Sequence, residues 1–136
     1  MIRTGAQYRQ GLRDGREVWI DGQRVADVVA HPALKPIIDI RARMYDMQHE
    51  AAHAPVLTYA ESDARHSIFN RLPKEQQDWH DKWKAVDTVM GDIKGVVTRV
   101  GDETVGEMWS PYDGRDVLNE IVRNAAGLSD KIKRSQ

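Results

Sequence analysis

Two long stretches of the chain repeat apolar residues every three or four positions, the spacing of an amphipathic helix. The first stretch begins near Pro36, because proline fits only the first turn of a helix, and extends to about Glu50 or His53. Its apolar positions are Leu34, Ile37, Ile38, Met44 and Met47. The apolar positions of the second stretch are Trp79, Trp83, Val86 and Met90. Because large aromatic side chains usually dominate a core, we expect its two tryptophans to be buried rather than to line a ligand pocket.

A third apolar face follows Pro111. It consists of Val117, Leu118, Ile121 and Val122. We expect Gly127 to end this helix as a C′ glycine, and residues 129–136 to form a solvated basic tail. Between the second and third faces, the glycines from Gly91 to Gly106 interrupt a valine-rich stretch, for which a glycine-tolerant helix is favoured over short strands.

The N-terminal part of the chain carries two local signals. Thr4 and Gln7 have the spacing of a capping box, which predicts a short helix that ends at about Asp14. Asp21 and Gly22 separate two short apolar segments, and an Asp-Gly pair suits a type I′ hairpin turn. Residues 55–73 are expected to form a loop with a short extended piece at 56–59.

These elements predict a mainly α-helical fold with one small β-hairpin. The 136 residues fall within the range of one domain, so we expect a helical domain over residues 1–128, followed by the tail.

Composition removes several classes of function. Twenty basic and 21 acidic residues give a formal charge of −1 without a basic block, so nucleic-acid binding has no support. The absence of cysteine excludes disulfides, thiolate catalysis and cysteine-ligated metals, and fits a reducing cytosol. No apolar run approaches the roughly 18 residues of a membrane span, and the first 16 residues lack the pattern of a signal peptide. We therefore expect a cytoplasmic protein that binds neither membranes nor nucleic acids.

His49, Glu50 and His53 form the pattern H-E-x-x-H, which on a helix can bind zinc and supply a general base for hydrolysis. Pro55 should end the helix almost at His53, and the sequence offers no clear third ligand. We therefore favour two solvated histidines at a helix C-terminus, expect no metal, and keep a zinc hydrolase as a remote alternative.

The remaining candidates for chemistry are weak. His31, His66 and His80 could transfer protons near neutral pH, but no obvious nucleophile accompanies them, so structural or surface roles are favoured. The glycines of residues 91–106 lack the spacing of a phosphate-binding loop.

The order of several short segments resembles the 4-hydroxyphenylacetate 3-hydroxylase family of flavin-dependent aromatic monooxygenases. The segments are Arg3-Thr-Gly-Ala-Gln-Tyr8, Arg24-Val-Ala-Asp27, His31-Pro32, Met44-Tyr-Asp-Met-Gln-His49, Leu57-Thr-Tyr59, Arg65-His66 and Pro73. The similarity covers residues 3–90 well and continues more loosely through residues 96–121. It places H-E-x-x-H where the family has only a helix end and a loop, which weakens the zinc interpretation further.

The resemblance implies a fold like the helical N-terminal domain of an acyl-CoA-dehydrogenase-like flavoprotein. Members hydroxylate phenols with FAD that a separate flavin reductase supplies in reduced form. They also contain a middle β-domain and a C-terminal helical bundle, which this chain would lack. We therefore expect the chain alone to be inactive and to hold FAD only weakly.

In the region where hydroxylases carry an Arg-Ser-Pro-Asp-Tyr-like element that contacts the substrate, this chain has Trp109-Ser-Pro-Tyr-Asp-Gly-Arg115. Tyr112 and Arg115 have suitable chemistry for a phenolate or carboxylate, although their order differs from that of the family. They are the candidate substrate-binding residues, whereas the resemblance assigns no catalytic or cofactor-binding residue.

The hypothesis is thus an N-terminal domain or subunit of a reduced-FAD-dependent aromatic monooxygenase. A non-catalytic interaction module that retains the domain is the alternative. If the chain is such a domain or subunit, the second and third apolar faces should be exposed. They would then bind a separate chain that carries the flavin domain, or a second copy of this chain.

Overall fold

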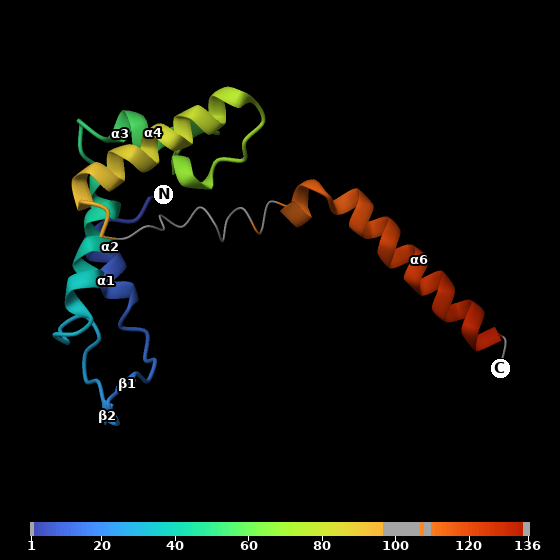
Figure 1. The fold of residues 1–136 in the computed structure, drawn as a ribbon, viewed down its shortest axis with the longest axis horizontal. Helices are drawn as coiled ribbons and strands as arrows, with labels where there is room; N and C mark the ends of the chain where they lie inside the picture. Colours follow the sequence, from blue (N-terminus) through green and yellow to red (C-terminus); the bar gives the residue numbers. More distant parts are fainter. Residues whose placement is uncertain (1, 97–106, 108–109, 135–136) are drawn as a thin grey trace. The chain divides into compact units, whose positions relative to one another are not determined.

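The computed structural model describes residues 2–96, 107 and 110–134. The chain divides into two compact units, Met1–Val100 and Gly101–Gln136, which are considered separately. The first unit contains four helices of more than three residues and two small hairpins, and the second contains one long helix (Figure 1). The prediction of a mainly helical fold is confirmed, but that of a single hairpin is wrong.

Helix α1, Gly5–Gly11, begins with the predicted capping box. The Gln7 backbone N–H donates to Thr4 Oγ1 at 3.2 Å, and the Thr4 backbone N–H donates to Gln7 Oε1 at 2.9 Å. The helix packs against α2, and the rings of Tyr8 and Tyr45 stack with their centroids 5.0 Å apart. A helix of only 7 residues is unstable alone, so this packing against α2 keeps it folded.

The predicted first hairpin pairs β1, Trp19–Ile20, with β2, Gln23–Arg24. Asp21 and Gly22 connect the strands with φ of 51° and 75°, the positive values that a type I′ turn requires. The Asp-Gly prediction is therefore confirmed, including its turn geometry.

Helix α2, Lys35–Met47, has proline in its first turn as predicted but ends before the expected Glu50 or His53. After Met47 each backbone N–H donates to the carbonyl three residues earlier instead of four. The N–H groups of His49 and Glu50 donate in this way to Asp46 O and Met47 O. The chain then turns into a second short helix, α3, Ala54–Leu57, in which Pro55 lies in the first turn. Pro55 therefore starts a helix rather than ending one, because its missing N–H is not needed there.

A second hairpin occupies most of the segment that was expected to be a loop. Strand β3, Thr58–Glu61, pairs antiparallel with β4, Ala64–Ser67. Its turn residues Ser62 and Asp63 have φ of 50° and 60° although neither is glycine. The usual sequence signal for such a turn is Asn-Gly or Asp-Gly, so the hairpin lacked a local signal.

Helix α4, Gln76–Ile93, follows a short 3₁₀ turn, η1, Ile68–Asn70. Its N-cap is Glu75, and its C-cap residue Lys94 has the left-handed φ of 56°. The core of the first unit lies where this helix meets α2, α3 and η1. Its buried residues are Met44, Met47, Leu57, Ile68, Phe69, Ala85, Val89 and Ile93.

The prediction that Trp79 and Trp83 are buried is wrong, since 53% and 63% of their surfaces are exposed. The buried face of α4 contains Asp78, Lys82, Ala85, Val89 and Ile93. Each tryptophan follows a member of this face by one position, and one position turns a helix by about 100°. Val86 and Met90, which were grouped with the tryptophans, are half-buried against the core.

The second unit contains α6, Arg115–Arg134. The prediction that Gly127 ends this helix is wrong, because α6 continues through it to Arg134, and most of the expected tail, 129–134, is helical. A glycine lowers helix stability by about 1 kcal/mol relative to alanine but does not forbid helical dihedrals.

Most of the glycine-rich stretch, residues 97–106, lies outside the described residues. Across the described ranges, no helix has both the length and the apolar character needed to cross a membrane.

Candidate functional site

The three residues of the H-E-x-x-H pattern do not lie on one helix, because α2 ends at Met47. His49 Nε2 lies 3.2 Å from the Arg3 carbonyl oxygen, whereas His53 Nδ1 lies 2.8 Å from Glu50 Oε2. The two imidazoles therefore make different contacts, and the helical geometry that a zincin site needs is absent from this segment.

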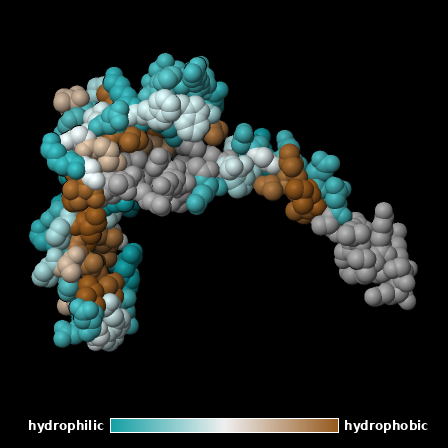
Figure 2. Space-filling model, in the orientation of Figure 1, coloured by the Kyte–Doolittle hydropathy of each residue, from teal (hydrophilic) through white to brown (hydrophobic). Residues whose placement is uncertain are grey.

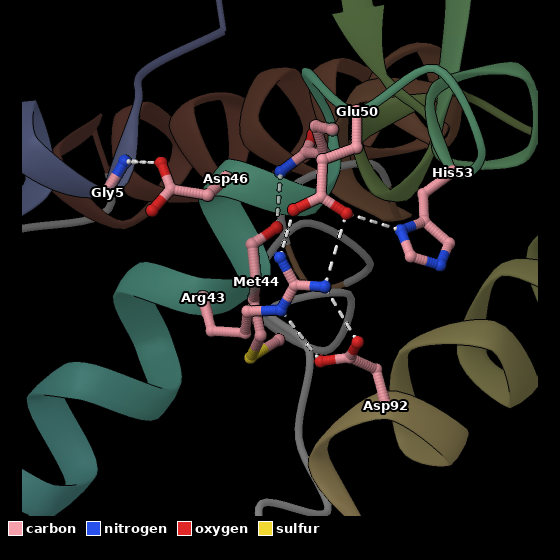
Figure 3. A network of polar contacts seen from close by, with 8 residues as sticks. Gly5, Arg43, Met44, Asp46, Glu50, His53 and Asp92 are labelled. Carbon is pink, nitrogen blue, oxygen red and sulfur yellow. Dashed lines mark hydrogen bonds and ion pairs between the residues drawn. The ribbon is translucent and has the colours of Figure 1, made fainter.

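Glu50 belongs to a polar network centred on Arg43 (Figure 3). Arg43 Nη2 donates to Glu50 Oε2 at 3.2 Å, and its Nη1 also contacts Glu50 Oε1. The same guanidinium donates to Asp92 on α4, from Nε at 2.9 Å and from Nη2 at 2.7 Å. One guanidinium thus joins α2, the following turn and α4.

This network determines the protonation of its carboxylates. Hydrogen bonds from Arg43, and then from His53, hold the pKa of Glu50 below its ordinary value. The Arg43 guanidinium likewise lowers the pKa of Asp92. A carboxylate that a cation stabilises in this way is a poor general base near neutral pH, which argues against Glu50 as the base of a hydrolase. Sequence reasoning missed Arg43 and Asp92, which lie 49 residues apart and form no local motif.

The other histidines make local contacts. His31 Nδ1 accepts a 3.3 Å hydrogen bond from the Ala33 backbone N–H, and the His66 ring lies 5.5 Å from the Tyr59 ring. His80 meets the Trp83 ring edge-on, also at 5.5 Å. Within residues 2–96, 107 and 110–134, no three His, Asp or Glu side chains are grouped so that they could hold a metal ion.

Tyr112 and Arg115 lie close together in the second unit. Arg115 Nη1 donates to the Tyr112 carbonyl oxygen at 2.9 Å, and the Arg115 Cζ atom lies 4.7 Å from the centre of the Tyr112 ring. Both residues are exposed, with 59% of the Tyr112 surface accessible. A phenolic hydroxyl and a fixed cation are therefore available side by side, a pair that can hydrogen-bond an anionic oxygen.

The residues that carry the family resemblance build the fold. Asp46 Oδ1 accepts a 2.7 Å hydrogen bond from the Gly5 backbone N–H, which fixes α1 on α2. Asp27 Oδ1 accepts a 3.0 Å hydrogen bond from the Val29 backbone N–H, and the same carboxylate binds Arg13. The His31 carbonyl oxygen accepts from the backbone N–H of Lys35 at the start of α2. These motif residues set turns and helix ends rather than forming a catalytic group.

Asp78 anchors the start of α4. Its Oδ2 accepts from the backbone N–H groups of Lys74 at 2.7 Å and Glu75 at 3.2 Å, and Arg71 Nη2 lies 2.7 Å from its Oδ1. The hydrogen bond from the Lys74 backbone N–H is the largest cause that lowers the pKa of Asp78, whose side chain is only 3% exposed. The start of this helix is therefore already occupied by a carboxylate.

Large apolar side chains remain exposed on both units. On α6 the exposed fractions are 62% for Val117, 44% for Leu118, 57% for Ile121 and 66% for Val122. We call these four residues the α6 face. Figure 2 shows apolar surface over the first half of α6 and over the limb that contains α1 and α2. Exposure of the α6 face agrees with the expectation of an exposed apolar surface. The exposed Trp79 and Trp83 agree with that expectation too, but contradict the separate expectation that they are buried in the core.

Comparison with known proteins gives a family match over residues 4–134, to the family described as 4-hydroxyphenylacetate 3-hydroxylase N terminal. The 4-hydroxyphenylacetate 3-monooxygenase oxygenase component of Thermus thermophilus is 29% identical over 125 residues, which cover 91% of this chain and 26% of that protein. The 2,4,6-trichlorophenol monooxygenase of Cupriavidus pinatubonensis is 33% identical over 98 residues, covering 70% of this chain and 19% of the relative.

Solved structures give the same result. A crystal structure of the oxygenase component HpaB of 4-hydroxyphenylacetate 3-monooxygenase matches 74% of this chain with a TM-score of 0.69 and 32% identity. A crystal structure of HpaB complexed with FAD matches 66% of this chain with a TM-score of 0.63. The two matches cover 22% and 19% of those chains, so this chain spans about a quarter or less of its relatives. The match over residues 4–134 and the likeness to HpaB show that the chain belongs to the 4-hydroxyphenylacetate 3-hydroxylase N-terminal family.

Proposed function

We propose that this chain is the N-terminal domain or subunit of the oxygenase component of an FAD-dependent aromatic monooxygenase. The observation that carries the proposal is the family match over residues 4–134. In this assignment the oxygenase hydroxylates a phenolic or other aromatic substrate in the cytoplasm, and a separate reductase supplies reduced FAD. The fold is then that of the helical N-terminal domain of an acyl-CoA-dehydrogenase-like flavoprotein.

We propose further that catalysis requires the rest of the oxygenase, because the chain corresponds to 26% of its Thermus relative. The N-termini of α1 and α4 do not fit the pyrophosphate of FAD. A phosphate group is commonly bound at the N-terminus of a helix, where free backbone N–H groups and the helix dipole favour an anion. In the first unit, Asp46 binds the first N–H of α1, and Glu75 and Asp78 cap α4. No step of the reaction is therefore assigned to a flavin held by these residues.

Tyr112 and Arg115 are the proposed substrate contacts. A Tyr hydroxyl can donate a hydrogen bond to a phenolate or carboxylate oxygen, and the Arg115 guanidinium can balance its charge. The carbonyl hydrogen bond between the two residues uses Arg115 Nη1 and leaves other guanidinium N–H groups to donate to a ligand. Their part in catalysis would be to bind and orient the substrate.

The α6 face is the proposed contact for the rest of the oxygenase or for a second copy of the chain. Contiguous exposed apolar residues usually mark an interface, and most of the stability of a helix in a protein comes from packing of its apolar face. Trp79 and Trp83 provide a second exposed apolar area on the first unit.

A non-catalytic interaction module is the second candidate. The observation that favours it is the order of residues in Trp109-Ser-Pro-Tyr-Asp-Gly-Arg115, which departs from the substrate-contacting element of the hydroxylases. A module of this kind would keep the fold and the α6 face but would have lost the substrate contacts.

Reconstitution distinguishes the candidates. The purified chain is first titrated with FAD, for which we expect no sub-micromolar binding. It is then combined with a co-expressed flavin-domain chain, a flavin reductase and NADH, and the hydroxylated product of 4-hydroxyphenylacetate is measured. A Tyr112→Phe or Arg115→Gln variant should raise KM for this substrate, whereas Arg123→Gln on the same helix is the control. If the Tyr112 and Arg115 variants form product with the KM of the wild type, their proposed role in substrate binding is wrong. If no complex hydroxylates an aromatic acid, the non-catalytic module is favoured.

A further inference from the structure

A hollow of about 700 Å³ lies at the base of the first hairpin, and neither Tyr112 nor Arg115 is among its lining residues. Half-buried apolar side chains form part of its lining, those of Leu12, Val25 and Val28. At Gly15, which also lines it, an added Cβ would meet no atom within 4 Å. Its size matches that of small-molecule sites, which are usually apolar with a few polar groups.

Three arginines are among the residues that line the same hollow, Arg13, Arg16 and Arg24. Asp27 is the single carboxylate among the lining residues, so these carry three positive charges and one negative charge. An arginine fork matches the two oxygens of a carboxylate better than a lysine does. The lining therefore combines an apolar surface with an excess of groups that bind carboxylates.

Each of these arginines has a carboxylate partner in an ion pair. Asp27 binds Arg13 through Nε and Nη2 and also accepts a hydrogen bond from the Val29 backbone N–H, so that pair is fixed. Arg16 binds Asp14 through Nε and Nη2, and Asp14 Oδ1 also accepts a 3.2 Å hydrogen bond from the Arg16 backbone N–H, with the two side chains 54% and 43% exposed. Arg24 pairs with Glu17, and both side chains are 61% exposed.

Exposed ion pairs of this kind contribute little to stability, because water solvates both partners and fixing them costs side-chain entropy. A ligand carboxylate can therefore compete with Asp14 for Arg16 and with Glu17 for Arg24, and neither acidic residue lines the hollow. The Asp27–Arg13 pair stays in place and leaves Arg13 Nη1, which donates to no residue in the described part of the chain, as a further donor.

We propose that this hollow binds a small organic carboxylate with an apolar body, whose carboxylate contacts Arg16 and Arg24 while the body lies against Leu12, Val25 and Val28. This inference goes beyond the proposed function and does not depend on it, because none of these residues belongs to the proposed substrate contact.

The test is an NMR titration of the full ¹⁵N-labelled chain with benzoate, its neutral isostere benzamide, and inorganic phosphate. We expect saturable shifts of the Gly15 and Ala26 amides with benzoate in the millimolar range, and at least tenfold weaker binding of benzamide and of phosphate. Arg16→Gln and Arg24→Gln should each weaken benzoate at least fivefold. Arg9→Gln, which removes an arginine paired with Asp39 outside the hollow, is the control.

Arg16→Lys keeps the positive charge but not the planar, bidentate guanidinium. We therefore expect its affinity for benzoate to lie between those of the wild type and of Arg16→Gln. Unchanged dispersion of the other amides shows that each variant is folded. Equal binding of benzamide, equal binding of phosphate, no saturable shift, or indifference to both glutamine variants would each overturn the proposal. Hydroxylation in the reconstituted oxygenase is measured separately, so failure of the hollow leaves the assignment of Tyr112 and Arg115 unaffected.

Discussion

The backbone N–H of Gly5 donates a 2.7 Å hydrogen bond to Asp46 Oδ1, and α1 approaches α2 so closely at this point that a side chain on Gly5 has no room. An added Cβ would lie 2.6 Å from the Ala42 carbonyl oxygen and closer still to Asp46 Oδ2. Because Ala42 O belongs to the backbone of α2, it cannot move without the helix. The contact explains why a glycine begins a helix for which its own propensity is poor.

Gly5→Ala should therefore lower the free energy of unfolding by about 1–3 kcal/mol, the usual cost of overpacking a tight contact. Urea unfolding followed by circular dichroism measures it. Gly11→Ala is the matched control, because its added Cβ meets only Arg3 Nη1, at 3.9 Å. Alanine there should be neutral or stabilising by up to about 1 kcal/mol. An equal effect of the two variants would contradict the contact.

Leu57→Ala should lower the free energy of unfolding by about 2–5 kcal/mol. The Leu57 side chain at the end of α3 is fully buried in the core, and its truncation leaves a cavity. Ile37→Ala, at a position with 42% of its surface exposed, should cost less than about 1 kcal/mol. The same urea measurement compares them. Similar losses at both positions would mean that the core does not lie around Leu57.

The Arg43–Asp92 pair should couple α2 to α4 energetically. Their side chains are 37% and 25% exposed, so solvent screening limits the expected coupling to about 0.5–1 kcal/mol. A double-mutant cycle with Arg43→Met, Asp92→Asn and the double variant measures it, and 1 M salt should reduce it. Additive effects within about 0.3 kcal/mol would show that the pair contributes nothing.

Stability should fall in acid partly because Asp78 becomes protonated. The folded chain lowers the pKa of Asp78 below its ordinary value of 3.8, so the unfolded chain binds the proton more readily. The stabilisation is therefore complete above about pH 5 and is lost as the pH falls through 3.8 toward the folded pKa. Urea midpoints from pH 6 to pH 3 should fall less steeply for Asp78→Asn than for the wild type, and a parallel fall would refute the assignment.

Asp63→Asn serves as the control for this series. It removes one exposed carboxylate at the turn between β3 and β4, without the hydrogen bonds that Asp78 accepts from Lys74 and Glu75. Asparagine tolerates the positive φ of that turn, so the change in backbone strain is small. The comparison separates the loss of one charge from the loss of the helix cap.

The sequence alone determined the elements whose signals are local. The capping box of Thr4 and Gln7, the Asp21-Gly22 turn and the proline in the first turn of α2 each follow from hydrogen bonds and dihedral angles within a few residues. The ordered motifs also determined the family, because many short matches in one order are specific even when each is weak. The second hairpin was missed because Ser62 and Asp63 adopt positive φ without glycine, under the constraint of strands that pair around them.

Only the tertiary structure decided which faces are buried and which distant side chains meet. Helical periodicity identified α4 as amphipathic, but a shift of one position separates its buried face from Trp79 and Trp83, and only packing against α3 and η1 selects that face. The Arg43–Asp92 contact and the close approach of Gly5 to Asp46 join residues 49 and 41 positions apart. No local pattern specifies such contacts, because their free energy depends on the arrangement of whole helices rather than on the residues beside them in sequence.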